Sequence, residues 1–203
     1  MVKNVYKENK MDLMRRRSML INRGGVTVKA ITAASAEFFS TPVLMPKNST
    51  VIIDCQIAKM SEFATYNSFF YWGAAKTYII KASSVQKISY YVATNDFQCQ
   101  ISAKKPISQL ILQPFSGTGT FTVTFDDGTV SSASRGNWVA RTTPLQMRLQ
   151  PNVYVKRVRQ INTGDVLVHD LTPDTQNDVP GMYDAVDGTF YPYSGGNAYI
   201  VDL

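Results

Sequence analysis

The sequence predicts an all-β fold, an antiparallel sandwich of the jelly-roll type, with a short α-helix in front of it. The first reason is composition: the 203 residues include 11 Tyr and 10 Phe and many Ser and Thr, but only three Glu. This bias suits strands better than helices. The second reason is rhythm, because ten or more short β-like segments follow one another without a helical pattern between them. Such an order is typical of antiparallel sandwiches, of which the jelly roll is a common type.

The candidate strands are short segments rich in β-branched and aromatic side chains, separated by polar, Pro-containing or Gly-containing turns. They span residues 26–32, 37–45, 49–60, 67–73, 77–81, 87–93, 97–102, 109–113, 119–132, 145–149 and 153–161. The clearest is 119–132, where Phe121, Val123 and Phe125 alternate with threonines. This alternation predicts a half-buried strand, and the following Asp127-Gly128 predicts a turn back into a second strand.

The N-terminal residues differ from the rest of the chain in charge and in pattern. Residues 1–23 hold seven basic and two acidic side chains, a net charge of +5, whereas the other 180 residues hold fourteen basic and thirteen acidic ones, a net charge of +1. Residues 2–21 are rich in helix formers and are followed by Gly24-Gly25, so we expect one helix here. A helix of this length is marginal alone in water, and its partner could be its own body, another copy or a different surface. A loosely ordered tail is the alternative.

We therefore divide the chain into an N-terminal anchor or oligomerisation segment, residues 1–25, and a β-domain, residues 26–203. The side chains expected to contact a partner lie on the apolar faces of the helix and in the basic run between them. They are Met11, Leu13, Met14, Arg15, Arg16, Arg17, Leu20 and Ile21. No apolar run approaches the roughly 20 residues of a membrane helix, and the charged N-terminus does not resemble a secretory signal. We expect a protein made in the cytoplasm, without a membrane partner.

The stretch 165–196 predicts short strands and tight turns. Val166-Leu167-Val168 is an apolar run that Pro173 is expected to end, because proline cannot donate to a sheet ladder. Val179-Pro180-Gly181 fits a turn. Asp187-Gly188 predicts a two-residue hairpin loop in which Ala185 pairs with Phe190. One face of this hairpin would carry Tyr183, Ala185 and Phe190, and the other Met182, Asp184, Val186 and Tyr191.

The same stretch resembles the C-terminal signature of a LamG-like, concanavalin A-like jelly-roll module of phage and prophage virion proteins. That signature is an acidic residue, Leu/Phe-x-Pro, a variable loop and Gly-Leu-Tyr-Asp-x-Val-x-Gly-x-Phe-Tyr, followed by a Gly-rich tail. The matching residues are Asp170, Leu171, Pro173, Gly181, Tyr183, Asp184, Val186, Gly188, Phe190 and Tyr191, with Ser194-Gly195-Gly196 as the tail. The resemblance extends over about residues 30–203, although the middle is matched only by the rhythm of its strands.

The resemblance implies a structural protein of a phage virion: a capsid decoration, a head fibre or a tail component, assembled in the host cytoplasm. The implied partners are other virion proteins and further copies of the chain, and the settings of the family lead us to expect a trimer. A second implied function is lectin-like binding of receptor or mucosal glycans as part of a tail fibre. The resemblance is specific for the fold and says little about biochemical activity.

The chain offers no recognisable catalytic constellation. Glycoside hydrolysis needs two carboxylates that flank the scissile bond. Laminarinase-like jelly rolls carry them in a Glu-x-Asp-x-x-Glu motif that is missing here, and Glu37 and Glu62 stand alone. His169 is the only histidine, and a metal or nucleophilic site built on it would need further ligands or an orienting partner. We expect a structural or surface role for His169 and no enzyme activity.

A Ca²⁺ site fits a lectin-like fold better than a histidine-based metal site. Asp174, Asn177 and Asp178 fall in one predicted loop and carry the oxygen ligands that Ca²⁺ prefers, but an ordinary polar loop has the same composition. We expect no cofactor. Cys55 and Cys99 lie in predicted strands and, without a secretory signal, are expected to be buried reduced thiols, although a disulfide between them is geometrically feasible.

Glycan binding would use exposed aromatic rings beside amides or carboxylates. The candidates are Phe69, Phe70, Tyr71, Trp72, Trp138, Tyr191 and Tyr193, although most aromatic side chains of a sandwich belong to its core. We do not expect nucleic-acid binding, because the basic run at the N-terminus has no interleaved aromatic residues and a charge run is usually a solvated face.

Overall fold

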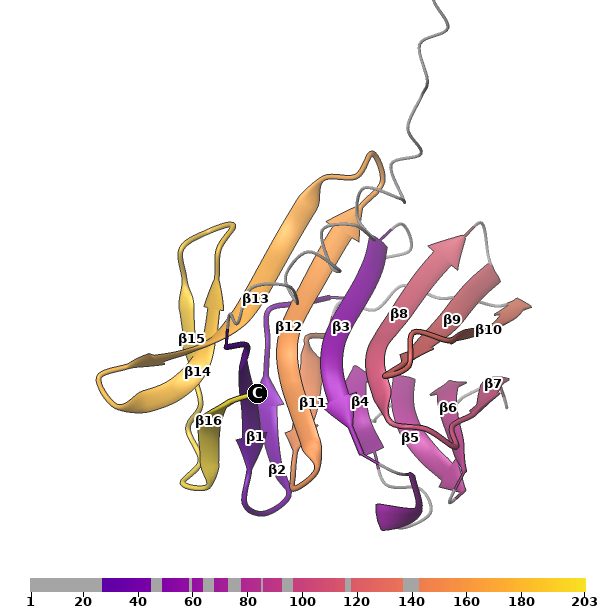
Figure 1. Ribbon diagram of the computed structural model, residues 1–203. Helices are drawn as coiled ribbons and strands as arrows, with labels where there is room; N and C mark the ends of the chain where they lie inside the picture. Colours follow the sequence, from indigo (N-terminus) through magenta and orange to yellow (C-terminus); the bar gives the residue numbers. More distant parts are fainter. Residues whose placement is uncertain are drawn as a thin grey trace, which may run out of the picture.

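A computed structural model describes residues 27–44, 49–58, 60–63, 68–72, 78–84, 86–92, 97–115, 118–136 and 143–203. Two antiparallel sheets form a sandwich in which one sheet lies behind the other (Figure 1). The prediction of an all-β antiparallel sandwich is therefore confirmed. The expected helix over 2–21, and with it every predicted anchor residue, lies outside the described residues. In the part that is described, no helix is long and apolar enough to cross a membrane.

The larger sheet has ten strands and the smaller sheet has six. The larger contains β1 (Lys29–Ala33), β3 (Ser49–Ile57), β8 (Ile107–Phe115), β9 (Thr118–Phe125), β10 (Val130–Gly136), β12 (Val153–Asn162), β13 (Leu167–Gln176), β14 (Val179–Asp184), β15 (Phe190–Pro192) and β16 (Ala198–Asp202). The smaller contains β2 (Glu37–Ser40), β4 (Ser68–Trp72), β5 (Tyr78–Ser84), β6 (Lys87–Val92), β7 (Phe97–Ser102) and β11 (Leu145–Leu149). A short 3₁₀ turn, η2 (Met60–Glu62), follows β3.

The core lies between the two sheets and follows from the alternation of the strands. In β9, Phe121, Val123 and Phe125 are buried, and the intervening Thr122 and Thr124 face outward. β11 shows the same pattern in the opposite sheet, with every second residue buried. Because successive side chains of a strand point to opposite faces, each sheet contributes one apolar face to a shared interior.

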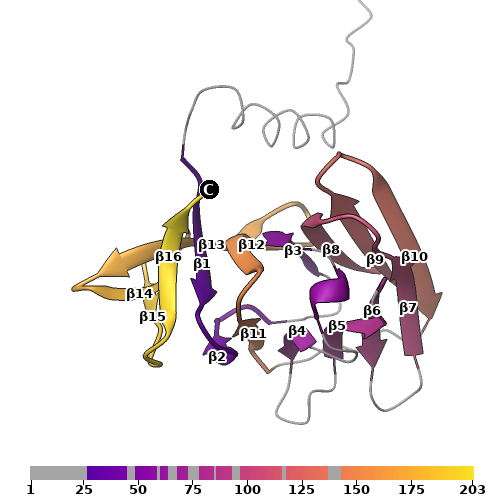
Figure 2. The same ribbon diagram turned by 60° about the horizontal axis from the view of Figure 1, so that its bottom comes forward.

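β12 is the strand at which the larger sheet divides. Its first half pairs with β1 at Ile31↔Val155, and its second half pairs with β13 from Val158↔Leu171 onward. An irregularity between Val155 and Arg157 separates the two halves. Beyond this point β13, β14 and β15 continue as a three-stranded extension, which we call the C-terminal arm (residues 167–192). In both views the tip that joins β13 to β14 extends away from the other strands (Figures 1 and 2).

The start of the described chain and its C-terminus are neighbours. β1 and β16 pair antiparallel along their whole length, and Val28 and Leu203 exchange backbone hydrogen bonds of 3.4 and 3.0 Å. Figure 2 shows the C-terminus beside the beginning of β1. β16 was not predicted, because Ser194-Gly195-Gly196 was assigned to a Gly-rich tail and residues 197–203 were given no element.

Two turn predictions in the C-terminal arm are wrong. Pro173 does not end β13, because beyond Leu171 the strand has only β14 as a partner, and a strand edge tolerates a residue that cannot donate. Val179-Pro180-Gly181 is the start of β14, not a turn. The chain turns instead at Asn177 and Asp178, whose φ angles of 50° and 63° are those of a two-residue hairpin loop.

The predicted register of the β14–β15 hairpin is also wrong, by two residues. Tyr183 pairs with Phe190, and Asp184 closes a four-residue loop by donating its N–H to the carbonyl of Thr189 at 2.8 Å. Gly188 has the expected positive φ of 75°, but Asp187 does not. Because side chains alternate with a period of two, a two-residue shift keeps Tyr183 and Phe190 on a common face.

Candidate functional site

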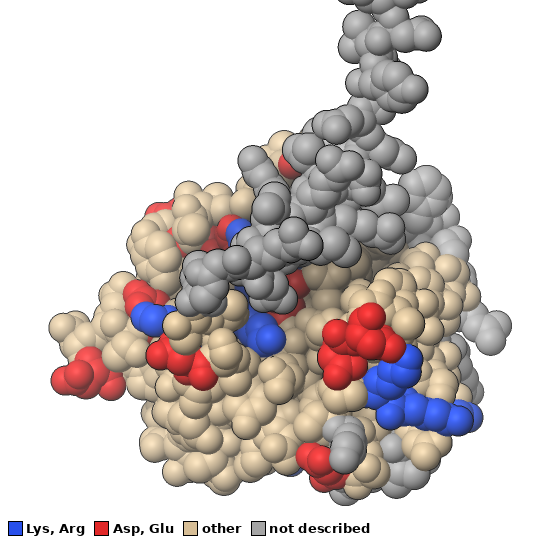
Figure 3. Space-filling model, in the orientation of Figure 1, with Lys and Arg blue, Asp and Glu red and all other residues tan. Residues whose placement is uncertain are grey.

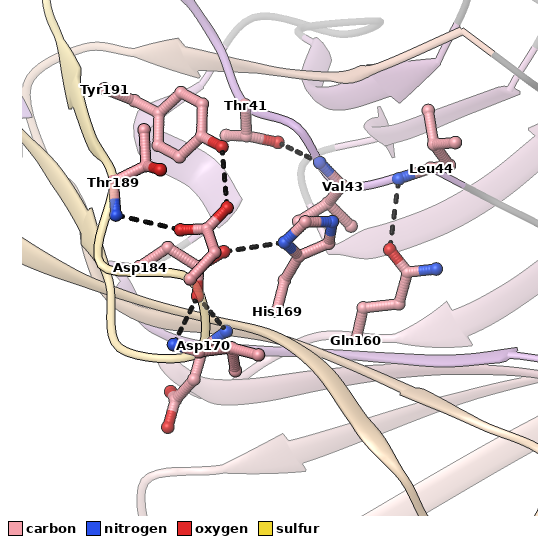
Figure 4. A network of polar contacts seen from close by, with 11 residues as sticks. Thr41, Val43, Leu44, Gln160, His169, Asp170, Asp184, Thr189 and Tyr191 are labelled. Carbon is pink, nitrogen blue, oxygen red and sulfur yellow. Dashed lines mark hydrogen bonds and ion pairs between the residues drawn. The ribbon is translucent and has the colours of Figure 1, made fainter.

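One cluster of the described residues combines an imidazole with two carboxylates. It consists of His169 from β13, Asp184 at the end of β14 and Asp187 in the loop that follows; one potential ligand atom from each lies within 4.8 Å of the other two. Figure 4 shows His169 and Asp184 pointing toward each other, with Thr189 and Tyr191 beside them. We call these three residues the His169 cluster.

Strand pairing brings the cluster together. Leu171 pairs directly with Asp184, so the two side chains lie on one face of the C-terminal arm. His169 is two residues before Leu171 and therefore shares that face. The neighbouring β14–β15 loop then carries Asp187 to the same place. The cluster forms only when β13 pairs with β14. The spacing of the three residues in the sequence therefore does not predict it.

Asp184 is the centre of the local hydrogen bonding. Its side chain is completely buried, so its carboxylate needs compensating donors. Oδ1 accepts the backbone N–H groups of Asp170 and Val186, both at 3.0 Å. Oδ2 lies 2.6 Å from Nδ1 of His169. Since a carboxylate can only accept, the Nδ1–H tautomer of His169 is the one that fits this contact, and it leaves Nε2 as an acceptor.

Asp187 and Tyr191 complete the polar surroundings on the exposed side. Oδ1 of Asp187 accepts the N–H of Thr189 at 2.8 Å, and the hydroxyl of Tyr191 lies 3.4 Å from Oδ2. The Thr189 N–H is the main reason why the pKa of Asp187 is lowered. Burial, followed by the charges of Asp187 and Asp184, raises the pKa of Tyr191. The carboxylates therefore create a negative potential at this point.

Two arginines of β12, Arg157 and Arg159, are engaged on the other face of the sheet. Asp170 follows His169 directly, so its side chain points the opposite way. It binds Arg157 through two hydrogen bonds of 2.6 and 2.5 Å, and this contact is the main reason why the pKa of Arg157 is raised. A second pair, Arg159–Asp54 at 2.7 Å, is joined by Gln109. On the face drawn in Figure 3, Lys and Arg side chains lie beside Asp and Glu side chains.

The predicted signature residues have structural roles in the arm. Gly181 lies so close to β15 that a Cβ atom would be 2.3 Å from the carbonyl oxygen of Tyr191 and 2.6 Å from the ring of Phe190. Pro173 is buried and pairs with Met182. Tyr183 and Phe190 pair across β14 and β15 on the outer face. The contact of Asp184 with His169 and the proximity of Asp187 were missed, because the pairing of β13 with β14 was not predicted.

Several other predicted candidates have a plain structural explanation. Asn177 and Asp178 are the central residues of the β13–β14 turn, and Asp174 lies within β13. Glu37 bonds Asn197, and Glu62 is exposed in η2. Cys55 is a buried free thiol, and its burial raises its pKa, so this half of the cysteine prediction is confirmed.

The aromatic candidates for glycan binding are mostly core residues. Phe69, Phe70 and Trp72 are fully buried, and Tyr71 and Tyr193 nearly so. Tyr191 is half-buried, and Trp138 lies outside the described residues. The structure instead exposes a residue that was not considered, Phe38 on β2, with half of its surface accessible. The sequence signal for this exposure was weak: Phe38 and the polar Ser40 are two residues apart and so lie on the same face of the strand.

Phe38 belongs to a small mixed patch on the outer face of the smaller sheet. Its ring meets the edge of Tyr71 with centroids 5.4 Å apart, and the guanidinium of Arg148 lies 5.9 Å from the ring centre. Gln146 donates to the hydroxyl of Ser40 at 3.3 Å in the same pair of strands. We call these five residues the Phe38 patch. No family model matches the chain, and no curated protein matches its sequence.

Proposed function

We propose that this protein is a structural component of a bacteriophage virion, in which residues 1–25 attach the protein to a capsid or tail and a jelly-roll β-domain faces outward. The observation that carries the proposal is the position of the chain ends. Because Val28 pairs with Leu203, the basic N-terminal segment joins the sandwich at one end of the β1–β16 pair. If the β-domain is attached to the particle only through this end, the rest of its surface can face outward.

The distribution of charge also supports an attachment role for the N-terminal segment and a display role for the β-domain. Residues 1–23 carry a net charge of +5, and the rest of the chain carries +1. In the described body, three basic side chains are paired with acidic ones: Arg157 with Asp170, Arg159 with Asp54 and Lys105 with Asp127. A segment with unbalanced charge is suited to a complementary partner, because opposite charges steer and orient association. Symmetric self-association, with a trimer as the proposed state, fits fibres and decorations.

Deletion of residues 1–25 tests the anchor. The truncated protein is expected to keep the far-ultraviolet circular dichroism and cooperative melting of a β-sandwich, but to be missing from purified particles in a co-sedimentation assay. Substitution of Arg15, Arg16 and Arg17 by Ser should give a partial loss, because it removes charge and leaves the apolar residues of the segment.

The matched control removes three exposed charges from the body instead, through Lys29→Ser, Lys87→Ser and Lys104→Ser. This variant should incorporate as the unmodified protein does. Normal incorporation of the truncated protein would contradict the anchor, and equal losses in both triple variants would show that overall charge, not the segment, matters. Light scattering on the full and truncated chains tests whether the same segment drives oligomerisation.

A second candidate function is glycan binding, and the Phe38 patch favours it. An exposed aromatic ring can stack on the apolar face of a sugar, while neighbouring hydroxyl, amide and guanidinium groups bond its hydroxyls. Ser40, Gln146 and Arg148 supply those groups around Phe38. This function is compatible with a virion location, since a displayed domain could also recognise a receptor.

A glycan array with the full chain decides this second candidate. We expect that Phe38→Ala abolishes any binding, whereas Tyr199→Ala leaves it unchanged, because Tyr199 has similar exposure at 44% but lies on β16 in the other sheet. Binding that survives Phe38→Ala would remove the patch from consideration, and silence across a broad array would favour a purely structural role.

A further inference from the structure

The His169 cluster has the ligand chemistry of a transition-metal site. It offers one imidazole nitrogen and two carboxylate oxygens, from two segments of chain, within 4.8 Å of one another. Zinc is bound in proteins by such nitrogen and oxygen ligands, whereas Ca²⁺ and Mg²⁺ prefer sites made entirely of oxygen. The histidine supplies the selectivity, since imidazole suits Zn²⁺ and its neighbours in the first transition row.

The charge balance of the cluster also points to a cation. Among the described residues, His169 at 2.6 Å is the only side-chain partner of the completely buried carboxylate of Asp184, which also accepts two backbone N–H groups. Asp187 adds a second carboxylate on the exposed side of the cluster. Arg157 and Arg159 of the neighbouring strand β12 are already paired with carboxylates on the opposite face. A buried charge in this position is stabilised by a partner of opposite sign.

We propose that His169, Asp184 and Asp187 bind one divalent transition-metal ion, with Zn²⁺ as the best-matched ion. Metal–ligand bonds of about 2.0–2.2 Å require the three donor atoms to lie about 3–4 Å apart around the ion. Nδ1 of His169 and Oδ2 of Asp184, now 2.6 Å apart, separate to this distance as the ion takes the place of the proton between them. That proton moves to Nε2, so the imidazole stays neutral, and water fills the fourth position.

The third ligand can reach the ion because it lies on the surface. Asp187 is exposed and belongs to the four-residue loop between β14 and β15, so its side chain can turn toward His169 without disturbing the core. The ion would then join this loop to β13 beside the contact of His169 with Asp184 that Figure 4 draws. Since the three residues come together only in the folded chain, metal binding should stabilise the fold. This inference does not depend on the virion function proposed above.

The experiment uses the untagged full chain and Zn²⁺ alone, followed by titration calorimetry and thermal melting. The chain has one histidine, so the imidazole signals in a nuclear magnetic resonance spectrum belong to His169 and report directly on its metal binding. Co²⁺ gives a second readout, because its visible absorption reveals the ligand geometry. Cys99→Ser is included so that binding to a thiol is recognised.

Two variants remove ligands with little change of shape. His169→Gln keeps an amide that can donate to Asp184, and Asp187→Asn keeps the oxygen that accepts the Thr189 N–H. The control is Asp178→Asn, which neutralises an exposed aspartate in the β13–β14 turn, where asparagine also tolerates the positive φ. Each ligand variant should weaken binding by about tenfold or more, and the control should bind like the unmodified protein.

The expected result is one equivalent of Zn²⁺, a rise in melting temperature and a shift of the His169 signals, all lost in His169→Gln. Because Asp187 is exposed, Asp187→Asn decides the matter even if His169→Gln does not fold. No binding at millimolar Zn²⁺, equal affinity in Asp187→Asn, or loss of binding only in Cys99→Ser would each overturn the proposal.

Discussion

The sandwich body and the C-terminal arm are stabilised in different ways. In the body, β9 places Phe121 and Val123 between two sheets, and burial of alternating apolar side chains accounts for its position. The arm also buries Leu171 and Met182 in the core, but it adds specific polar and backbone contacts: the buried Asp184 beneath the β14–β15 loop and the close approach of Gly181 to β15. We therefore expect the body to tolerate a change of side-chain shape as long as the volume is kept, and the arm to be sensitive to changes of single atoms. The following experiments test this difference, from the largest expected effect to the smallest.

Phe121→Ala should cause the largest loss of stability. The side chain is completely buried, faces Leu112 across the sheet and lies 6.0 Å from the ring of Tyr90 in the opposite sheet. The cavity should lower the free energy of unfolding by about 3–5 kcal/mol, measured by urea denaturation. Phe121→Leu restores most of the volume and should recover much of the loss. If both variants lose the same amount, packing volume does not explain the stability of the body.

Gly181→Ala should destabilise the arm although it adds only one methyl group. The added carbon would lie 2.3 Å from a backbone oxygen of Tyr191, which cannot move aside like a side chain. We expect a loss of about 1–3 kcal/mol in the same assay. Gly196→Ala is the control, because nothing lies within 4 Å of the position its Cβ would take. Similar values for the two variants would rule out the close approach as the reason for glycine at 181.

Asp184→Asn should have an intermediate effect that leaves the body intact. The amide oxygen can still accept from the N–H groups of Asp170 and Val186, but the contact with His169 loses its charge. We expect a loss of about 1–2 kcal/mol and faster hydrogen exchange in the β14–β15 loop, with unchanged exchange in β9. Asp174→Asn in the same arm should change neither. Uniformly faster exchange throughout the chain would show that arm and body unfold as one unit.

The smallest expected effect is on the stability of the protein at acidic pH. The pKa of Asp187 is lowered in the folded state, chiefly by the N–H of Thr189, so its contribution to stability is present above the unfolded value of about 3.9. It is lost as pH falls from there through the folded value. Asp187→Asn should therefore show a shallower loss of stability over this acidic range than the unmodified protein. Parallel pH curves for the two proteins would contradict this assignment.

The strands of the body were predictable because the alternation of apolar and polar residues within each segment indicates a strand. β7 and β11 have the predicted bounds of 97–102 and 145–149, and β9 follows its Phe–Thr alternation. The arm was predicted less well, although its faces were assigned correctly. In the arm, pairing with adjacent strands determines the conformation of Pro173, Pro180 and Gly181. A rule based only on the local sequence therefore predicts a strand end or a turn where the structure has a strand. β16 was missed because a five-residue strand after a Gly-rich tail exists only through its pairing with β1.

The sequence by itself determined that the chain forms an antiparallel β-sandwich and that its charge is concentrated in the N-terminal residues, because strand alternation and charge distribution are properties of the chain alone. Only the tertiary structure decided that His169 meets Asp184 and Asp187, that Phe38 is exposed while Phe69 and Trp72 are buried, and that Val28 lies beside Leu203. Each of these depends on which strands pair and in which register. Register is set by the packing of the whole sheet, since a shift of two residues keeps every side chain on its face but changes every neighbour.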